Sequence, residues 1–193
     1  MKKFELTAEF VTNVFGKKLF RIKALVAFGD VEKGELGGFI EKEDNLSHDD
    51  NAWVYGNAQV SGNAWVSGNA QVSGNARVYG NAQVYGNARV YGNAQVYGNA
   101  QVYGDARVSG DAQVSGNADY AAVAGFGRYS RTTTFFRCKD KILRVQCGCF
   151  YGDLAQFREI VKKTHGDSKY AKEYLAIADL MELHFSDECG GEQ

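Results

Sequence analysis

Hydrophobic and polar positions alternate with a strict six-residue period between residues 51 and 120. The phrase A-x-V-[YS]-G-[ND] recurs there without insertion, so valine occupies every sixth position from Val54 to Val114, and Tyr120 takes the next one. Small apolar residues that alternate with polar ones indicate a strand with one buried face. Gly-Asn or Gly-Asp then ends the strand, because glycine tolerates positive φ and Asn and Asp are the next most tolerant residues. Each phrase therefore predicts a short strand followed by a corner.

Repetition of this phrase predicts a stack of coils. Three corners close one triangular coil of about eighteen residues, and hydrogen bonds join each coil to the next about 4.8 Å along the axis. Alanine and valine would fill the narrow interior, and the corner Asn residues would form side-chain ladders. A heptad helix is excluded because Gly-Asn interrupts every turn, and a collagen helix is excluded because glycine does not occupy every third position. Disorder is the remaining alternative, which the regular inward positions disfavour.

The sequences on either side of the repeats predict two caps. Residues 1–38 are expected to form an N-terminal β cap, with the strand-like runs FELTAEFV and KLFRIKALVAF joined by a turn near Asn13 and Gly16. The β-helix is expected over residues 39–123, with a degenerate first coil that begins at Ile40 and Leu46. Residues 124–188 predict an α+β domain, and residues 189–193 predict a flexible tail.

The C-terminal domain is expected to contain a β-hairpin and two antiparallel helices. TTTFFRCK and ILRVQCGCF predict the hairpin strands. Asp153 suits the N-cap of the first helix and Gly166 its C-cap. The residues expected to face inward are Leu154, Phe157, Ile160 and Val161 on the first helix, and Tyr174, Leu175, Ala178, Met181 and Phe185 on the second, with Ile177 at the edge.

Valine followed four positions later by alanine, as in Val54 and Ala58, resembles the hexapeptide repeat of the left-handed parallel β-helix family. The expected fold class is therefore mainly β: a left-handed parallel β-helix of about four regular coils between an N-terminal β cap and a C-terminal α+β cap. The resemblance implies frequent trimers, and many members of this family are acyltransferases.

The segments outside the repeats resemble a group of hexapeptide-repeat proteins found in bacteria, phages and prophages. This resemblance rests on GKKLFRIKAL and GDVEKGELGGFIEKEDNLS at the start, and on TTTFFRCKD, CGCFYGDLAQF and KKTHGDSKYAKEYL at the end. Proteins of this group are similar to proteins labelled as transferases or polymer-forming proteins. The resemblance implies a phage context, in which inhibition of a host defence system is an expected role.

Composition narrows the classes of partner. The chain has 22 basic and 23 acidic residues, so its net charge of −1 gives no general attraction to nucleic acid or to an anionic membrane. No apolar run approaches the length of a membrane span, and MKKFELTAEF lacks the apolar core of a signal peptide, so a cytoplasmic location is expected. The cysteines at 138, 147, 149 and 189 are expected to be reduced thiols.

Histidines and cysteines offer two weak candidates for chemistry. An acyltransferase needs a base, and His48 in SHDD could serve, with Asp49 or Asp50 to orient it, although a solvated loop histidine is the simpler interpretation. Cys147 and Cys149 could join His165 or Cys138 around zinc, but C-x-C lacks the spacing of the usual C-x2-C pair. Two small buried thiols are the simpler interpretation, and no cofactor is expected.

The outer surface of the coils is the stronger candidate. Aromatic residues and arginine among glutamine and serine are typical of an interface core, and they also suit a planar, anionic, nucleotide-like ligand. Pairs of tyrosines that only stabilise the sheet are the alternative. The candidate residues are Trp53, Trp65, Arg77, Arg89, Arg107, Tyr79, Tyr85, Tyr91, Tyr97 and Tyr103.

The sequence therefore favours a non-enzymatic binding or scaffold protein that forms a homotrimer or another homo-oligomer. A host protein or a nucleotide-like small molecule is the expected further partner, given the phage resemblance. Two alternatives stay open: an acyltransferase that uses acyl-CoA with His48 as its base, and a structural protein that forms filaments.

Overall fold

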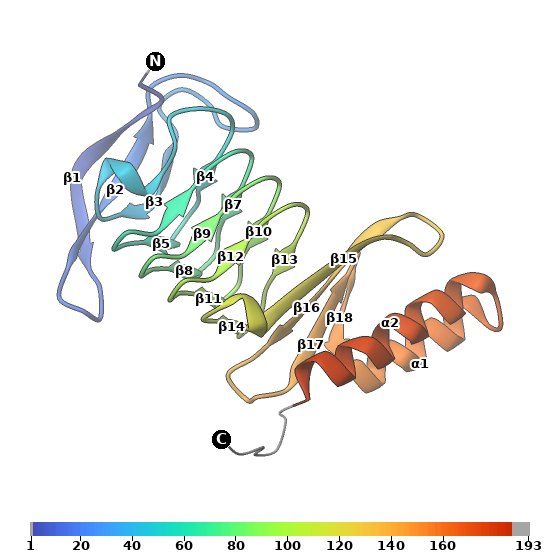
Figure 1. Cartoon of the computed structure of the whole chain (residues 1–193). Coiled ribbons are helices and arrows are strands. Elements are labelled where there is room, and N and C mark those ends of the chain that lie inside the picture. The colour runs from blue at the N-terminus through green and yellow to red at the C-terminus, as the bar shows by residue number, and fades with distance from the viewer. Residues whose placement is uncertain (1, 187–193) are drawn as a thin grey trace. The chain divides into compact units, whose positions relative to one another are not determined.

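The computed structural model describes residues 2–186, which fall into two compact units that divide between Asn117 and Ala118 (Figure 1). The tail predicted at 189–193, and Cys189 within it, lie outside the described residues. Within residues 2–186, no helix has the length and apolar character needed to cross a membrane.

The first unit is a parallel β-solenoid whose coils are stacked along one axis (Figure 1). Valines of successive coils pair eighteen residues apart, as in the register of Val54 with Val72 and of Val72 with Val90. Every repeat alanine and valine from Ala52 to Val114 is buried, which confirms the predicted β-helical fold. The strands are β4 (Trp53–Val54), β5 (Gln59–Val60), β6 (Trp65–Val66), β7 (Gln71–Val72), β8 (Arg77–Val78), β9 (Gln83–Val84), β10 (Arg89–Val90), β11 (Gln95–Val96), β12 (Gln101–Val102), β13 (Arg107–Val108) and β14 (Gln113–Val114).

The corners of the solenoid are held by glycine and by ladders of side-chain amides. Gly68 has φ +64, and its backbone lies against that of Gly86 in the next coil. Along one corner, Asn51 donates to Asn69 (3.0 Å), Asn69 to Asn87 (3.1 Å) and Asn87 to Asp105 (2.9 Å). The predicted ladders therefore form. This one ends on an aspartate, whose carboxylate accepts hydrogen bonds but has none to donate.

An N-terminal cap continues one sheet of the solenoid. Strands β1 (Phe4–Thr12), β2 (Lys18–Ala24) and β3 (Leu36–Ile40) are antiparallel neighbours, and β3 then runs parallel to β5. Ile40 pairs with Val60 and Leu46 bridges to Val66, so the predicted degenerate first coil exists. A 3-10 helix, η1 (Glu43–Asn45), lies between them, and the side chain of buried Asn45 donates to the carbonyl oxygens of Gly62 and Ala64.

The second unit packs two helices on an antiparallel sheet. A short 3-10 helix, η2 (Asn117–Asp119), precedes the sheet, whose strand order is β15 (Tyr120–Phe126), β16 (Arg131–Arg137), β17 (Leu143–Cys147) and β18 (Phe150–Asp153). Helices α1 (Leu154–His165) and α2 (Lys169–Phe185) share one apolar core with this sheet. The predicted hairpin is β16 with β17, but β15 and β18 extend it on both sides. Tyr120, which follows the valine spacing, begins β15.

The helix ends follow the local sequence, while two inward-facing positions differ from expectation. The Asp153 side chain accepts a hydrogen bond from the Gln156 N–H (2.8 Å), so the predicted N-cap is confirmed. Ile160 is 38% exposed although it was expected to face inward. On α2, Ile177, expected at the edge, is buried in the core, while Leu175, expected to face inward, is only partly buried.

Candidate functional site

The solenoid presents three outer surfaces, one on each of its three sheets. The hairpin face is formed by β5, β8, β11 and β14; the groove face by β4, β7, β10 and β13; and the open face by β6, β9 and β12. Outward side chains of the same repeat position stack along each face, because the strands of each face pair in register eighteen residues apart. The predicted surface residues are therefore divided among three separate surfaces.

The hairpin face carries the stacked rings of Tyr79 and Tyr97, whose centroids are 5.1 Å apart at an angle of 5°. The Tyr79 hydroxyl donates to Oε1 of Gln95 (3.2 Å), and burial raises the pKa of this hydroxyl. Phe15, at the tip of the β1–β2 hairpin, lies 5.5 Å from the Tyr79 ring. Arg77 lies on the same face, in register with Gln95. The cap therefore covers part of this surface.

Trp53 differs from its prediction as a surface residue. Its side chain is fully buried, with the ring of Phe28 at 5.3 Å and that of Phe4 at 6.2 Å between centroids. The cap lies over the outward position of β4, so this tryptophan anchors the cap to the first coil. Trp53 is consequently removed from the candidate binding surface.

A polar groove of about 380 Å³ lies on the groove face. Arg89 and Arg107 are neighbours in register along it, and Tyr55 lines it together with Gln71. Burial raises the pKa of the Tyr55 hydroxyl, and the nearby carboxylates of Glu35 and Asp30 raise it further. Asp30 and Asp105 also line the groove. Their charges offset those of the two guanidinium groups, so the groove suits a ligand with both donors and acceptors better than a polyphosphate.

Tyr91, from the same repeat position, is half-buried at the edge of the groove face, where register places it between Ser73 and Ser109. It has no tyrosine directly above or below it in this stack, in contrast to the stacked pairs on the other two faces.

The open face carries the most accessible rings of the repeats. Tyr85 and Tyr103 are stacked, with centroids 5.4 Å apart at an angle of 15°. Trp65 is 44% exposed and Tyr103 is 52% exposed. Residues 51–117 include neither lysine nor glutamate, so this aromatic surface is bordered by few charges. Exposed aromatic rings in a surface poor in lysine and glutamate are typical of the core of a protein interface.

His48 is held by the cap in a way that occupies its basic nitrogen. Its ring stacks on Phe4 (4.3 Å between centroids), and Nδ1 accepts a hydrogen bond from the Lys3 backbone N–H (3.1 Å). A neutral imidazole has one acceptor nitrogen, so the proton resides on Nε2, which lies 3.7 Å from Oε2 of Glu43. The geometry gives His48 a packing role, and its carboxylate neighbour is Glu43 rather than the expected Asp49 or Asp50.

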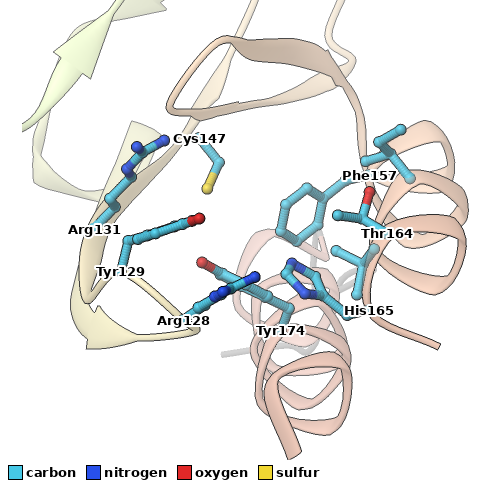
Figure 2. A pocket seen from close by; sticks show the side chains of 10 residues that line it. Arg128, Tyr129, Arg131, Cys147, Phe157, Thr164, His165 and Tyr174 are labelled. Atoms are coloured by element: carbon cyan, nitrogen blue, oxygen red, sulfur yellow. The ribbon is translucent and has the colours of Figure 1, made fainter. Parts of the chain in front are cut away.

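The candidate zinc ligands do not form a ligand set. Among residues 2–186, no group of three His, Cys, Asp or Glu side chains is placed to hold a metal ion. Gly148 turns the chain with φ +59 between Cys147, which is half-buried, and Cys149, which is exposed. The Thr133 hydroxyl donates to Sγ of Cys147 (3.2 Å). Cys147 and His165 do line one pocket in the second unit (Figure 2).

Sequence reasoning missed most of that pocket. The pocket includes Arg128, Tyr129 and Arg131. These residues follow Tyr120, in a stretch where the six-residue phrase no longer recurs. Tyr174 was assigned to the helix core alone. Two arginines around a tyrosine, in a stretch just beyond the last repeat, are the local signal that could have indicated a binding role.

Comparison with known families supports the class of protein that the fold defines, a β-solenoid repeat protein. The family model described as the YdcK beta solenoid repeat matches residues 52–68, 58–71, 70–84, 82–98, 94–110 and 100–116. The similarity covers about a third of the chain and is confined to the repeats. No curated protein matches the sequence.

Proposed function

We propose that this protein is a non-enzymatic binding scaffold that self-associates through the open face of its solenoid. The observation that carries the proposal is the aromatic surface formed by the exposed rings of Trp65 and Tyr103 and the half-buried ring of Tyr85. The cap covers parts of the other two faces, at Tyr79 and at Trp53, and it leaves these three rings accessible. Burial of large aromatic side chains is a main source of association free energy.

A second copy of the chain is the partner that fits this surface best. The open face repeats the same positions in register from β6 to β9 and β12, so two copies can meet along it with the same residues on each side, as closed symmetric oligomers require. The outward strand positions of the open face are Trp65, Gln83 and Gln101, so two copies that meet there bring no like charges of these strands together. A homotrimer is the state that the hexapeptide-repeat resemblance implies.

In this proposal the groove face holds a further partner. A host protein is favoured over a nucleotide-like ligand, because Asp30 and Asp105 offset the positive charges of Arg89 and Arg107. Replacement of both arginines by glutamine is expected to weaken capture of that partner without changing the mass of the oligomer.

Sedimentation velocity on matched variants tests self-association. The full chain is expected to sediment with a mass several times that of the 21.2 kDa monomer, and Tyr103→Glu is expected to sediment as a monomer. Tyr91→Glu is the control, because Tyr91 occupies the same repeat position on the groove face. A monomeric wild type, or equal dissociation of both variants, would contradict the proposal. Sedimentation as very large polymers would instead support the filament-forming alternative.

A further inference from the structure

A second pocket, of about 200 Å³, lies wholly within the C-terminal unit (Figure 2). One wall is formed by Arg128 and Tyr129 in the loop after β15 and by Arg131 at the start of β16, and the opposite wall is formed by α1 and α2. Figure 2 shows the hydroxyl groups of Tyr129 and Tyr174 and the thiol of Cys147 directed toward the space between these walls. None of these residues has a part in the solenoid surfaces described above.

The loop that forms the first wall is fixed to α2. Gly127 has φ +73 and lies so close to the Tyr174 hydroxyl that any Cβ would overlap with it. Its N–H donates to Oε2 of Glu173 (2.9 Å). Burial, and then the Cys147 thiol, raise the pKa of Tyr174 to about 12, so the hydroxyl stays protonated and can donate a hydrogen bond. The pocket is therefore formed before any ligand arrives.

The polar groups around the pocket favour an anion. The guanidinium groups of Arg128 and Arg131 lie over the Tyr129 ring, at 5.5 and 4.8 Å from its centroid. His165 adds a group that can carry positive charge, and none of the described residues that line the pocket is aspartate or glutamate. Arginine remains charged at any physiological pH and binds a carboxylate with two parallel hydrogen bonds.

The inner part of the pocket favours a flat apolar body. Phe157 and Val161 are buried there, and the Phe157 ring meets that of Tyr174 edge-on at 5.8 Å. A volume of about 200 Å³ corresponds to roughly six or seven water molecules, which is below the range for drug-sized ligands. A single ring with one charged group is the size of molecule that this space accepts.

We propose that this pocket binds a small aromatic carboxylate, with the carboxylate on Arg128 and Arg131 and the ring against Phe157 and Val161. The Tyr174 hydroxyl is placed to donate to the ligand as well. This site is independent of the self-association proposed for the solenoid, since every residue that it uses belongs to the second unit.

Titration of the full chain with benzoate, followed by backbone amide NMR, tests the site. Saturable shifts are expected at Tyr129, Cys147 and His165. Benzamide, the neutral analogue of the same shape, is expected to bind roughly tenfold more weakly, and so is benzoate to Arg131→Gln, because a hydrogen bond to a charged group is lost in each case. Arg128→Gln serves as a second variant, and both arginines are exposed, so neither change endangers the fold.

Arg158→Gln is the matched control. Arg158 belongs to α1 but pairs with Asp179 and Glu182 at the surface and does not line the pocket. Benzoate is expected to bind this variant as it binds the wild type. The proposal is overturned if millimolar benzoate gives no saturable shifts, if benzamide binds as well as benzoate, or if Arg158→Gln weakens binding as much as Arg131→Gln does.

Discussion

Among single residues, Lys3 shows how the N-terminal cap is attached to the first coil. Its buried ammonium donates to the carbonyl oxygens of Asp49 (3.3 Å), Asp50 (3.3 Å) and Ala52 (2.9 Å), and it lies 4.7 Å from the centre of the Phe28 ring. These carbonyls belong to a segment where the coil is longer than the repeat and Asp50 has φ 54. Burial lowers the pKa of Lys3 to about 8, although the charges of Asp50 and Asp49 oppose this shift.

The lowered pKa makes the stability of the first unit depend on pH. The unfolded chain holds the Lys3 proton up to a pKa near 10.5, and the folded chain releases it near 8. The unfolded state therefore binds more protons between these values, and the free energy of unfolding should rise as pH rises through that window. Below pH 8 both states are protonated, and the full cost of the buried charge is present.

Urea unfolding at pH 8 and at about 9, where most tyrosine hydroxyls are still protonated, measures this effect. The Trp65→Phe background leaves buried Trp53 as the fluorescent reporter of the cap and first coil. The rise in stability between the two pH values is expected to disappear in Lys3→Met. An identical rise with and without Lys3 would show that another group causes it.

Residues in equivalent repeat positions could not be distinguished from sequence alone. Trp53 and Trp65 both stand between alanine and valine, yet one is buried under Phe28 and the other is 44% exposed. The difference comes from the loop that carries Phe28, more than twenty residues earlier in the chain. The residues around Trp53 give no indication of that contact. The same holds for His48, whose partner Lys3 lies 45 residues away.

At the level of structural elements, the corners determine how closely the coils approach. Gly86 (φ +70) faces the backbone of Gly104 in the next coil, where an added Cβ would lie 2.9 Å from the Gly104 nitrogen. Gly104 (φ +64) has open space at the same position, because its neighbouring coil no longer covers it. The two glycines share the strained backbone conformation and differ only in this contact.

The matched substitutions Gly86→Ala and Gly104→Ala separate the effect of the positive φ from the effect of the contact with the next coil. Each is expected to lose roughly 1–2 kcal/mol of stability from alanine at positive φ. Gly86→Ala should lose more, because the backbone of the next coil has to move away from the methyl group. Thermal unfolding of both variants against the wild type measures the difference, and an equal loss would contradict the close coil packing.

Structural elements that are specified by a short stretch of their own sequence could be predicted. Elements that form only by pairing with another part of the chain could not. The solenoid strands and corners follow from six-residue phrases, and the helix ends follow from Asp153 and Gly166. In contrast, β15 has the weak sequence YAAVAGF and becomes a strand by pairing with β16. The pocket of the second unit was missed for the same reason, since its walls come from the loop between β15 and β16, from β16 and β17, and from both helices.

At the scale of the whole molecule, the valines and alanines of the solenoid are buried, so only its outward side chains can contact a partner. Sequence predicted that the aromatic and arginine residues would be the outward ones, and except for Trp53 the structure places them there. It could not show which face is open, because the hairpin tip and the cap loop decide that. The claim that remains to be measured is that the open face, with Trp65 and Tyr103, is buried against another copy.

Acrylamide quenching of Trp65 fluorescence tests this claim most directly. The two tryptophans give an internal comparison, since Trp53 is buried in the single chain and its contribution is known from Trp65→Phe. Trp65 is expected to be protected in the wild-type oligomer and to become accessible in Tyr103→Glu. Equal quenching of Trp65 in the wild type and in Tyr103→Glu would contradict the account, because the open face would then meet solvent in both.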